Sequence, residues 1–549
     1  MRVIIKKSCY VLTASTLFII FANYSAFGQI LAIPPELYTR AERTNYEETS
    51  LHKDVMNFVY ALQKHSDIAH LEIIGASKKG RDIPLVVMAD PPVKTPEEAV
   101  KSDKPVIYIQ GNIHAGEVEG KEASMELMRE IAFGPKRRLL SDQIILFCPI
   151  YNADGNDSLS ATSRRSQEGS PQLTGTRSSG EGYDLNRDGL RIEALETIAL
   201  IENVILKWNP ALFMDLHTTN GSWHGYSLTY APGNHTAGHP GTTDYLMNVL
   251  FPAVQKKVKE RSGLDIYLYG NFGGMPPESF TATPHMPRFL TNSMALKNKL
   301  AILVETFAHD RFEKRILSNT VFITSVLEFT NEHGGEILKV IKKAEEETVQ
   351  QVLENTGNFQ KGVQFRVAQL GEPSDLLVYE TEEYVDESGR PIQRRTGKLV
   401  WMPNVRMMQR YEPVKMSTVP RGYVFPAELK NVADKLKQHG VDVKVLEKST
   451  SFEGEEFLVT GFSQAERPYQ NHNLVTIEGE FKKAVKEFPA GFFHVDLAQP
   501  FAYLVFYMLE PEADDGLAVW NYFDKYLKAQ GVENKSVPYP VFKYITIKK

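Results

Sequence analysis

Cysteine is nearly absent from this chain of 549 residues, which contains only Cys9 and Cys148. Two cysteines exclude a disulfide-rich scaffold and a cysteine-rich metal site. A surplus of positive charge is also lacking, because 62 Lys and Arg residues face 68 Asp and Glu residues for a formal net charge of −6. No run of Lys and Arg is long enough to follow a phosphate backbone. We therefore expect no nucleic-acid partner.

Two catalytic motifs are missing as well, since the sequence has neither a G-x-S-x-G nucleophile elbow nor a P-loop. Serine-hydrolase chemistry and nucleotide binding are thereby disfavoured. The composition is that of a globular protein, with 42% hydrophobic and 24% charged residues, which excludes disorder and collagen-like repeats. At roughly 150 residues per domain, the chain has room for two or three domains.

The first 28 residues have the features of a secretory signal peptide. A basic start at 1–7 precedes an apolar stretch at 9–27, and Ala26-Phe27-Gly28 fits a cleavage site between small residues. An uncleaved anchor is the alternative, because the apolar run approaches the length of a membrane span. A lipid anchor on Cys9 is less favoured, since no matching cleavage pattern precedes it.

Cleavage at this site leaves a mature chain with no membrane span. Its one cysteine is then Cys148, so it cannot form an internal disulfide. An exported protein of this size without disulfides is typical of a bacterial envelope. The predicted location is the bacterial periplasm or the extracellular medium.

The part of the chain before residue 350 predicts an α/β fold. Short apolar runs indicate buried strands, and the stretches between them have helical spacing, as in 51–63 and 122–131. Alternating strands and helices favour a sheet covered by helices. The apolar runs are 106–109, 144–150, 211–214 and 300–304.

A charged amphipathic helix at 336–354 and the turn after it suggest a domain boundary. We expect a catalytic domain over 40–350 and a smaller mixed α/β accessory domain over 359–549. The accessory part contains a hairpin-like stretch at 382–395 and an aromatic-rich stretch at 501–507, read as a strand. It carries no motif that converts into chemistry, so its role stays open.

Two histidines and a glutamate follow or end buried strands. His114 and Glu117 stand three residues apart where a strand passes into a helix, and His217 ends another strand. Two His and one carboxylate form a catalytic zinc set with a position open for water. Taken singly, the pair also fits a helix N-terminus, and the lone histidine fits a hydrogen-bonded core residue.

Polar residues at two more places are candidate catalytic or substrate-binding residues, expected at the same edge of the sheet. Glu305 ends the run 300–304, where a buried carboxylate is costly without a partner. It is either a general base or half of a salt bridge. The turn from Asp184 to Asp188 contains Asn186 and Arg187, whose donors suit a substrate carboxylate. Asp184 can accept a hydrogen bond from a ligand histidine, although a purely structural polar turn fits as well.

Together these residues resemble the zinc carboxypeptidases of the carboxypeptidase A/B type. Gly75-Ala-Ser-Lys-Lys-Gly-Arg81 is similar to the early G-x-S-x-x-G-R signature of that family. Asn152-Ala-Asp-Gly155 is similar to its N-P-D-G turn, with Ala153 in place of proline. The resemblance covers about residues 45 to 340, and it implies a mixed β-sheet flanked by helices.

The resemblance implies a role for each candidate residue. His114, Glu117 and His217 would bind one Zn²⁺ per chain, with Asp184 orienting a ligand histidine. Glu305 would act as general base on metal-activated water. The residues expected to bind the substrate's C-terminal carboxylate are Asn186 and Arg187.

An arginine that polarises the scissile carbonyl is also implied. Arg164, Arg165 and Arg177 are the candidates, and Arg177 is favoured because its neighbours Thr176 and Ser178 are closest to the family's local pattern. The sequence departs from the family by lacking its mobile tyrosine in the stretch 283–289. His285 and Arg288 are possible replacements there, while Tyr267 and Tyr269 lie too far upstream to assign by count.

The predicted function is that of a metallocarboxypeptidase that hydrolyses C-terminal residues from peptides with a free C-terminal carboxylate. One alternative is a zinc amidase or deacylase acting on N-acyl amino acids, whose zinc ligands are similar. The other is a non-catalytic peptide-binding protein that keeps the fold, which the retained Glu305 disfavours.

Overall fold

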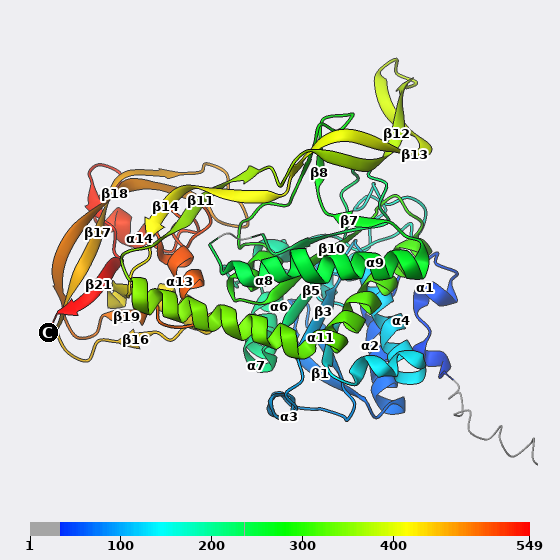
Figure 1. Ribbon diagram of the computed structural model, residues 1–549, viewed down its shortest axis with the longest axis horizontal. Helices are drawn as coiled ribbons and strands as arrows, with labels where there is room; N and C mark the ends of the chain where they lie inside the picture. Colours follow the sequence, from blue (N-terminus) through cyan, green and yellow to red (C-terminus); the bar gives the residue numbers. More distant parts are fainter. Residues whose placement is uncertain (1–32, 235–236, 549) are drawn as a thin grey trace, which may run out of the picture.

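The computed structural model describes residues 33–234 and 237–548, so the predicted signal peptide lies outside the described residues. Figure 1 shows two regions side by side, joined by a long helix, α11 (Phe312–Asn355), and by long strands above it. Within the described residues, no helix combines the length and apolar character needed to cross a membrane.

The first region is built on an eight-stranded mixed sheet. Its central strands β4, β3, β5 and β10 run parallel. The pairs β1–β2, β2–β4 and β10–β6 are antiparallel, and β6–β7 is parallel. In pairing order the strands are β1 (Ala69–Ala76), β2 (Asp82–Met88), β4 (Ile144–Cys148), β3 (Val106–Gly111), β5 (Leu212–Thr218), β10 (Leu300–Thr306), β6 (Leu228–Pro232) and β7 (Ile266–Leu268).

Helices bury both faces of this sheet. Ile107 and Ile109 of β3 point into one apolar core, and Tyr108 between them points into another. This explains why the central strands are continuous apolar runs. The helices over the first face are α2 (His52–His65), α4 (Glu119–Phe133), α8 (Pro240–Tyr245), η5 (Leu246–Leu250), α9 (Phe251–Ser262) and α11; those over the second are α3 (Pro96–Lys101), α6 (Leu195–Leu200), η4 (Ile201–Ile205), α7 (Leu206–Trp208) and α10 (Leu290–Leu296).

Short helical turns complete the first region: η1 (Pro35–Leu37), α1 (Arg40–Arg43), η2 (Pro135–Leu140), α5 (Ala153–Asn156) and η3 (Leu185–Arg187). The predicted fold class, a mixed sheet flanked by helices with a second mixed α/β part, is confirmed. Cys148 is free and buried at the end of β4.

The second region has its own seven-stranded sheet and its own apolar core. Its strands are β16 (Lys444–Val445), β19 (Phe493–Asp496), β15 (Gly422–Phe425), β21 (Phe542–Lys548), β17 (Thr450–Gln464) and β18 (Val475–Phe488), with β20 (Val537–Pro538) beside β17. Its helices are η6 (Ala427–Leu429), α12 (Lys430–Gln438), α13 (Ala502–Leu509) and α14 (Asp524–Ala529).

One prediction in this region is wrong. The aromatic-rich stretch 501–507 is not a strand, because residues 502–509 form helix α13. Every residue of α13 is buried, so its sequence shows no polar face. A short apolar run without periodicity is compatible with either a strand or a buried helix.

A β-hairpin arm extends above the first region (Figure 1). Strands β12 (Ser374–Val385) and β13 (Pro391–Met408) form it, as the stretch 382–395 predicted. The base of β13 pairs with β9 (Ser279–Thr281), which pairs with β8 (Asn271–Gly273). Strands β11 (Gln360–Ala368) and β14 (Arg410–Thr418) pair with each other nearby.

Candidate metal centre and active site

The predicted catalytic residues meet at the carboxyl ends of three neighbouring parallel strands. His114 follows β3, His217 lies near the end of β5, and Glu305 lies near the end of β10. Strand β5 pairs with both others, and the pairing sets Glu305 directly opposite His217. The convergence expected from strand order is therefore what the structure contains.

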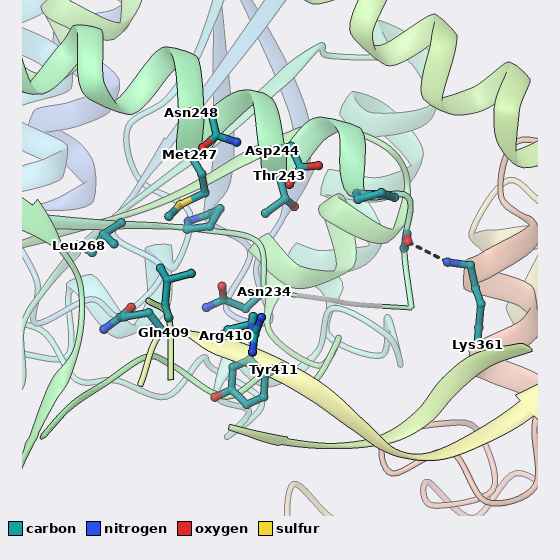
Figure 2. Close-up of a pocket in the computed structure, with 14 residues that line it drawn as sticks. Asn234, Thr243, Asp244, Met247, Asn248, Leu268, Lys361, Gln409, Arg410 and Tyr411 are labelled. Carbon is teal, nitrogen blue, oxygen red and sulfur yellow. Dashed lines mark hydrogen bonds between the residues drawn. The ribbon is translucent and has the colours of Figure 1, made fainter. Parts of the chain in front are cut away.

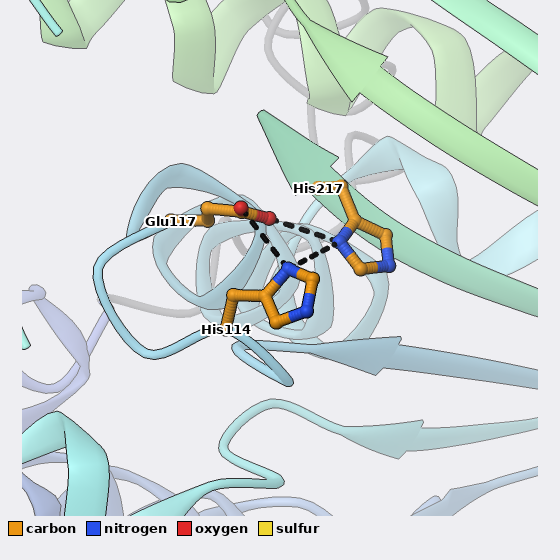
Figure 3. A group of neighbouring side chains, drawn as sticks. All are labelled: His114, Glu117 and His217. Carbon is orange, nitrogen blue, oxygen red and sulfur yellow. Dashed lines mark hydrogen bonds and ion pairs between the residues drawn. The ribbon is translucent and has the colours of Figure 1, made fainter. Parts of the chain in front are cut away.

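Three side chains form a compact group of metal-ligand type (Figure 3). The Nδ1 atoms of His114 and His217 are 3.2 Å apart. His114 Nδ1 lies 3.1 Å from Glu117 Oε1, and His217 Nδ1 lies 2.9 Å from Glu117 Oε2. All the candidate ligand atoms lie within 4.8 Å of one another. Two imidazole nitrogens facing one carboxylate match the donor types that zinc prefers.

Carboxylates hold the far side of both imidazole rings. His114 Nε2 lies 3.1 Å from Asp184 Oδ1, the contact predicted for Asp184. His217 Nε2 lies 3.0 Å from Asp215 Oδ2. Each ring thus presents Nδ1 to the group and Nε2 to a carboxylate, as ligand histidines commonly do.

Sequence analysis missed Asp215. The side chain is fully buried and is held by Gln110, whose Nε2 donates to Asp215 Oδ1 at 3.1 Å. Tyr108 OH donates in turn to Gln110 Oε1 at 2.9 Å. The signal was available, because Asp215 and His217 are two apart on a strand and so point to the same face.

The charges of the group perturb one another. Burial disfavours ionisation of Glu117, yet His114 and Arg164 hold its pKa well below the usual range. Burial likewise disfavours the charged form of His217, but Asp215 and Glu117 raise its pKa well above the ordinary value. Without a metal ion, the carboxylates thus favour a protonated histidine where a cation would bind.

Glu305 is a buried carboxylate beside this group. It is 8% exposed, and its Oε2 has no hydrogen-bond partner among the described residues. Burial raises its pKa to about 8, with Glu117 adding to the rise and His217 opposing it. No salt bridge of Glu305 occurs within 33–234 and 237–548, so the structural alternative finds no support there.

A cavity of ≈ 240 Å³ joins the metal-ligand group to the other candidates. It is lined by His114, Glu117, Arg164, Arg177, Asn186, Arg187, His217, Thr218, Asn220, Tyr269, Asn271, Thr283, Pro284, Phe289, Thr291, Leu303 and Glu305. All the predicted site residues line this cavity except Asp184, which contacts His114 from behind.

Two of the three candidate arginines reach the cavity. Arg164 Nη1 lies 2.9 Å from Glu117 Oε1, and its Nη2 donates to the carbonyl oxygens of Thr218 and Thr219 at 2.9 and 3.1 Å. Arg177 donates from Nε to Asp184 Oδ2 at 2.8 Å and is 44% exposed. Arg165 does not line the cavity.

Asn186 and Arg187 occupy the short turn η3. Arg187 Nη1 donates to the Asn186 carbonyl at 2.7 Å, and its guanidinium lies 4.1 Å over the ring of Phe289. Asn186 Oδ1 accepts from the backbone N–H of Leu290 at 3.0 Å. The two side chains are thereby fixed at the cavity wall.

The suggested replacements for the family tyrosine are placed elsewhere. His285 Nε2 lies 2.9 Å from Asp514 Oδ2, and Arg288 donates from Nε to Asp515 Oδ1 at 2.8 Å. Neither lines the cavity, because both are engaged by the second region. Tyr269 lines it instead; burial, with Glu305 nearby, raises the pKa of its hydroxyl. Sequence counting could not place this residue because β8 and β9 intervene.

A second cavity of ≈ 580 Å³ lies apart from these groups. Figure 2 shows Met247 and Asn248 on one side and Gln409, Arg410 and Tyr411 on the other. None of the predicted site residues lines it.

The family model and two relatives that match this chain are all described as carboxypeptidases. A family model described as zinc carboxypeptidase matches residues 55–188. Carboxypeptidase 2 of Trichophyton rubrum is 23% identical over 473 residues, which cover 83% of this chain and 80% of that protein. Carboxypeptidase 2 of Trichophyton tonsurans is 22% identical over 459 residues, which cover 80% and 78%. The predicted resemblance to zinc carboxypeptidases is confirmed.

Solved structures similar to this chain include a metallo-carboxypeptidase from Burkholderia cenocepacia, at 15% identity and a TM-score of 0.39, over 51% of this chain and 70% of that one. Another is a metallo-carboxypeptidase from Pseudomonas aeruginosa in complex with (2-guanidinoethylmercapto)succinic acid, at 15% identity and a TM-score of 0.38, over 52% and 68%.

Proposed function

We propose that this protein, whose residues 55–188 match the zinc carboxypeptidase family model, is a zinc-dependent metallocarboxypeptidase that removes C-terminal residues from peptides. The observation that carries the proposal is one cavity lined by the metal-ligand group, the buried Glu305 and the paired Asn186 and Arg187. The residues proposed to carry out hydrolysis and those proposed to recognise the end of the peptide thus line the same cavity.

His114, Glu117 and His217 would hold the metal ion, one per chain. Their donor types fit zinc, and Asp184 and Asp215 behind the imidazoles keep each Nδ1 directed at the group. When bound, zinc supplies Lewis-acid polarisation of a carbonyl and makes water more acidic.

Glu305 is proposed as the general base. Its free Oε2 can accept a proton from the attacking water and pass that proton to the leaving amine. Burial keeps bulk water away from this carboxylate, and it raises the pKa toward neutrality, where proton acceptance and donation are both accessible.

Arg187 and Asn186 are proposed to bind the terminal carboxylate of the peptide. The stacking of Arg187 on Phe289 orients the plane of its guanidinium, which suits a two-point contact with a carboxylate. Arg177 is proposed to stabilise the developing oxyanion, since Nη1 and Nη2 of Arg164 already contact Glu117 and two backbone carbonyls.

The cavity also suggests which terminal side chains are accepted. Among the described residues, Glu117 and Glu305 are the acidic ones that line it, and both have a proposed role. Leu303, Pro284 and Thr291 supply an uncharged wall. With no further acid to neutralise a basic side chain, we propose a preference for uncharged C-terminal residues.

The test is the metal content of the purified protein together with the mass-spectrometric products of a peptide mixture. We expect about one zinc per chain and loss of single residues from free C-termini. Zinc without peptide cleavage would favour the deacylase or the non-catalytic binder, and a folded protein that takes up no zinc would overturn the site.

We also propose that residues 1–28 are removed on export and that the mature chain divides into parts at 40–350 and 359–549. Sequencing the N-terminus of protein recovered outside the cytoplasm tests the first point. An N-terminus that still includes the basic start would contradict cleavage.

A further inference from the structure

The turn that carries Asn186 and Arg187 belongs to a segment, residues 184–193, that lies against the second region. Leu190 of this segment is fully buried in the core of that region, together with residues such as Phe425 and Leu436. The backbone of the segment therefore packs against side chains that are far away in the sequence.

A hairpin tip in the second region makes the contact nearest the metal-ligand group. Gln470 Oε1 accepts a hydrogen bond from the backbone N–H of Asp184 at 2.9 Å. The side chain of the same Asp184 contacts His114 Nε2 and Arg177 Nε. Asp184 is thus the one residue between Gln470 and the ligand histidine His114, and Asn186 follows Asp184 two positions along the chain.

The geometry of this tip is demanding. Tyr469 and His472 pair across it through two backbone hydrogen bonds of 2.8 and 3.0 Å. The central residues Gln470 and Asn471 have φ values of 51° and 66°, as a tight two-residue hairpin requires. Asparagine adopts this conformation readily, whereas glutamine does so at a cost of about 1 kcal/mol. The contacts of Gln470 with the Asp184 N–H and with Arg191 Nη1 offset this cost.

Further contacts hold the rest of the segment. His439 Nε2 donates to the Leu190 carbonyl at 2.8 Å, and Lys435 Nζ donates to the Ile192 carbonyl at 3.0 Å. His472 Nε2 lies 3.0 Å from Glu193 Oε2. The buried guanidinium of Arg191 lies 4.5 Å over the ring of Trp520.

The loop that contains Phe289, the second wall of the carboxylate site, is also held by residues of the second region. Phe289, on which Arg187 stacks, follows Arg288, whose backbone N–H and Nε both donate to Asp515 at 2.8 Å. The Gly189 N–H donates to the Arg288 carbonyl at 2.8 Å, which ties the two walls together. Both walls therefore depend on residues of the second region.

We propose that the second region is a positioning element for the carboxylate-binding site, and that Gln470 is the residue through which it fixes the Asp184–Arg187 turn. The proposal rests on the proposed function for the identity of the bound group, a peptide C-terminal carboxylate. Gln470 itself does not line the cavity, so it acts through Asp184, Asn186 and Arg187.

The positioning role predicts which kinetic constant changes. Loosening the turn misplaces Asn186 and Arg187, which bind the substrate before and during the reaction, so KM is the constant expected to rise. Glu305 on β10 and His217 on β5 are held by the sheet. The contact of Gln470 with Asp184 is to the backbone N–H only, so the side-chain contacts of Asp184 with His114 and Arg177 are retained and kcat should change less than KM.

The experiment compares full-length Gln470→Asn with Asn471→Gly. Asn at 470 keeps the backbone conformation and the amide but is one methylene too short to reach the Asp184 N–H. Asn471→Gly changes the same turn without removing a contact to Asp184, so it serves as the control. For Gln470→Asn, KM for a free-carboxylate peptide should rise about 3–10-fold, equivalent to the loss of one hydrogen bond, with kcat changed less than about twofold.

A second measurement does not depend on activity. Amide hydrogen exchange over residues 184–193, followed by mass spectrometry on both variants, should be faster in Gln470→Asn and unchanged in Asn471→Gly. An unchanged KM with unchanged exchange in Gln470→Asn overturns the proposal and leaves the peptidase function intact. A parent protein that cleaves no peptide overturns the proposed function, and the exchange comparison then decides the positioning role by itself.

Discussion

Glu305 is the residue on which the proposed chemistry depends most. Replacing it with glutamine removes the proton acceptor without changing the shape of the cavity. We expect Glu305→Gln to retain zinc and to lose about 10²–10⁴-fold in kcat, measured on a synthetic peptide with zinc content determined in parallel.

Glu328→Gln is a suitable control for that variant, because Glu328 is also a buried carboxylate, at 9% exposure, but pairs with Arg138 and Arg261 away from the cavity. Near-normal activity of Glu305→Gln would contradict the general-base role.

Asp215 contacts His217 from the side opposite the metal-ligand group. The negative charge of Asp215 fixes the imidazole of His217 and raises its pKa. Replacing Asp215 with asparagine removes this charge. We expect Asp215→Asn to weaken zinc binding about 10–100-fold, measured by competition with a chelator. The exposed Asp67→Asn is the control, and equal zinc affinity in the two variants would show that Asp215 does not support the ligand.

Arg187 discriminates between chain ends in the proposed mechanism. Removing its charge should raise KM for peptides with a free carboxylate about 10–100-fold, as expected for hydrogen bonds to a charged group. KM for peptides ending in an amide should change much less. Steady-state kinetics of Arg187→Ala on the two peptide series tests this, and a parallel rise in both would assign Arg187 a structural role.

The apolar runs before His114, His217 and Glu305 were sufficient to predict that these residues meet at one edge of the sheet. Their roles, and that of Glu117, were implied by the resemblance to a family and stay predictions. Gln470 and Tyr269 could not be predicted in this way. Gln470 is 286 residues from Asp184, its hydrogen-bond partner, and nothing in a single sequence marks such a contact.

Among the elements, α4 contains a half-buried carboxyl group, that of Glu126, that the site does not use. Burial, together with Glu42, raises the pKa of Glu126 to about 8, and its Oε1 has no hydrogen-bond partner among the described residues. A carboxyl whose pKa is raised by folding is favourable when protonated, so its contribution to stability is lost as the pH rises from about 4.5 through about 8.

Glu126→Gln should therefore stabilise the protein at alkaline pH by about 1–3 kcal/mol and change little near pH 4. Urea unfolding at the two pH values measures the difference. Glu130→Gln on the same helix is the control, since Glu130 is partly exposed and paired with Lys136. A gain that does not depend on pH would contradict a titrating Glu126.

Continuous apolar runs allowed the central strands of the first region to be predicted from the sequence. The apolar runs of β3 and β10 could be placed within two residues of their observed ends, because continuous burial on both faces needs uninterrupted apolar sequence. In α13 the same feature was misleading, since a helix buried on all sides has no polar stripe to show a helical period.

On the scale of the whole molecule, the two regions share a core. Leu190, Leu296 and Val352 come from the first region and pack into the core of the second. Truncation after residue 355 would expose these side chains and remove the supports of the 184–193 segment. We expect the truncated chain to be poorly soluble or to lose most peptidase activity, measured by recovery of soluble protein and by turnover per bound zinc.

Full activity from a soluble truncated chain would contradict this dependence and would make the second region dispensable for catalysis. The full-length chain prepared in parallel is the reference, so that solubility and turnover are compared under the same conditions.

Glu305 and His217 face each other on paired strands, while Asn186 and Arg187, the residues proposed to bind the substrate, lie in a turn supported by contacts from the second region. In the proposed mechanism, changes to those supporting contacts can alter which peptides are accepted without disturbing the strand pair that contains Glu305 and His217. A library of substitutions confined to 465–474 and 514–520 is therefore a starting point for redesigning specificity at constant turnover. Substitutions there change the residues that contact Asp184 and Arg288 and leave the cavity lining itself unchanged.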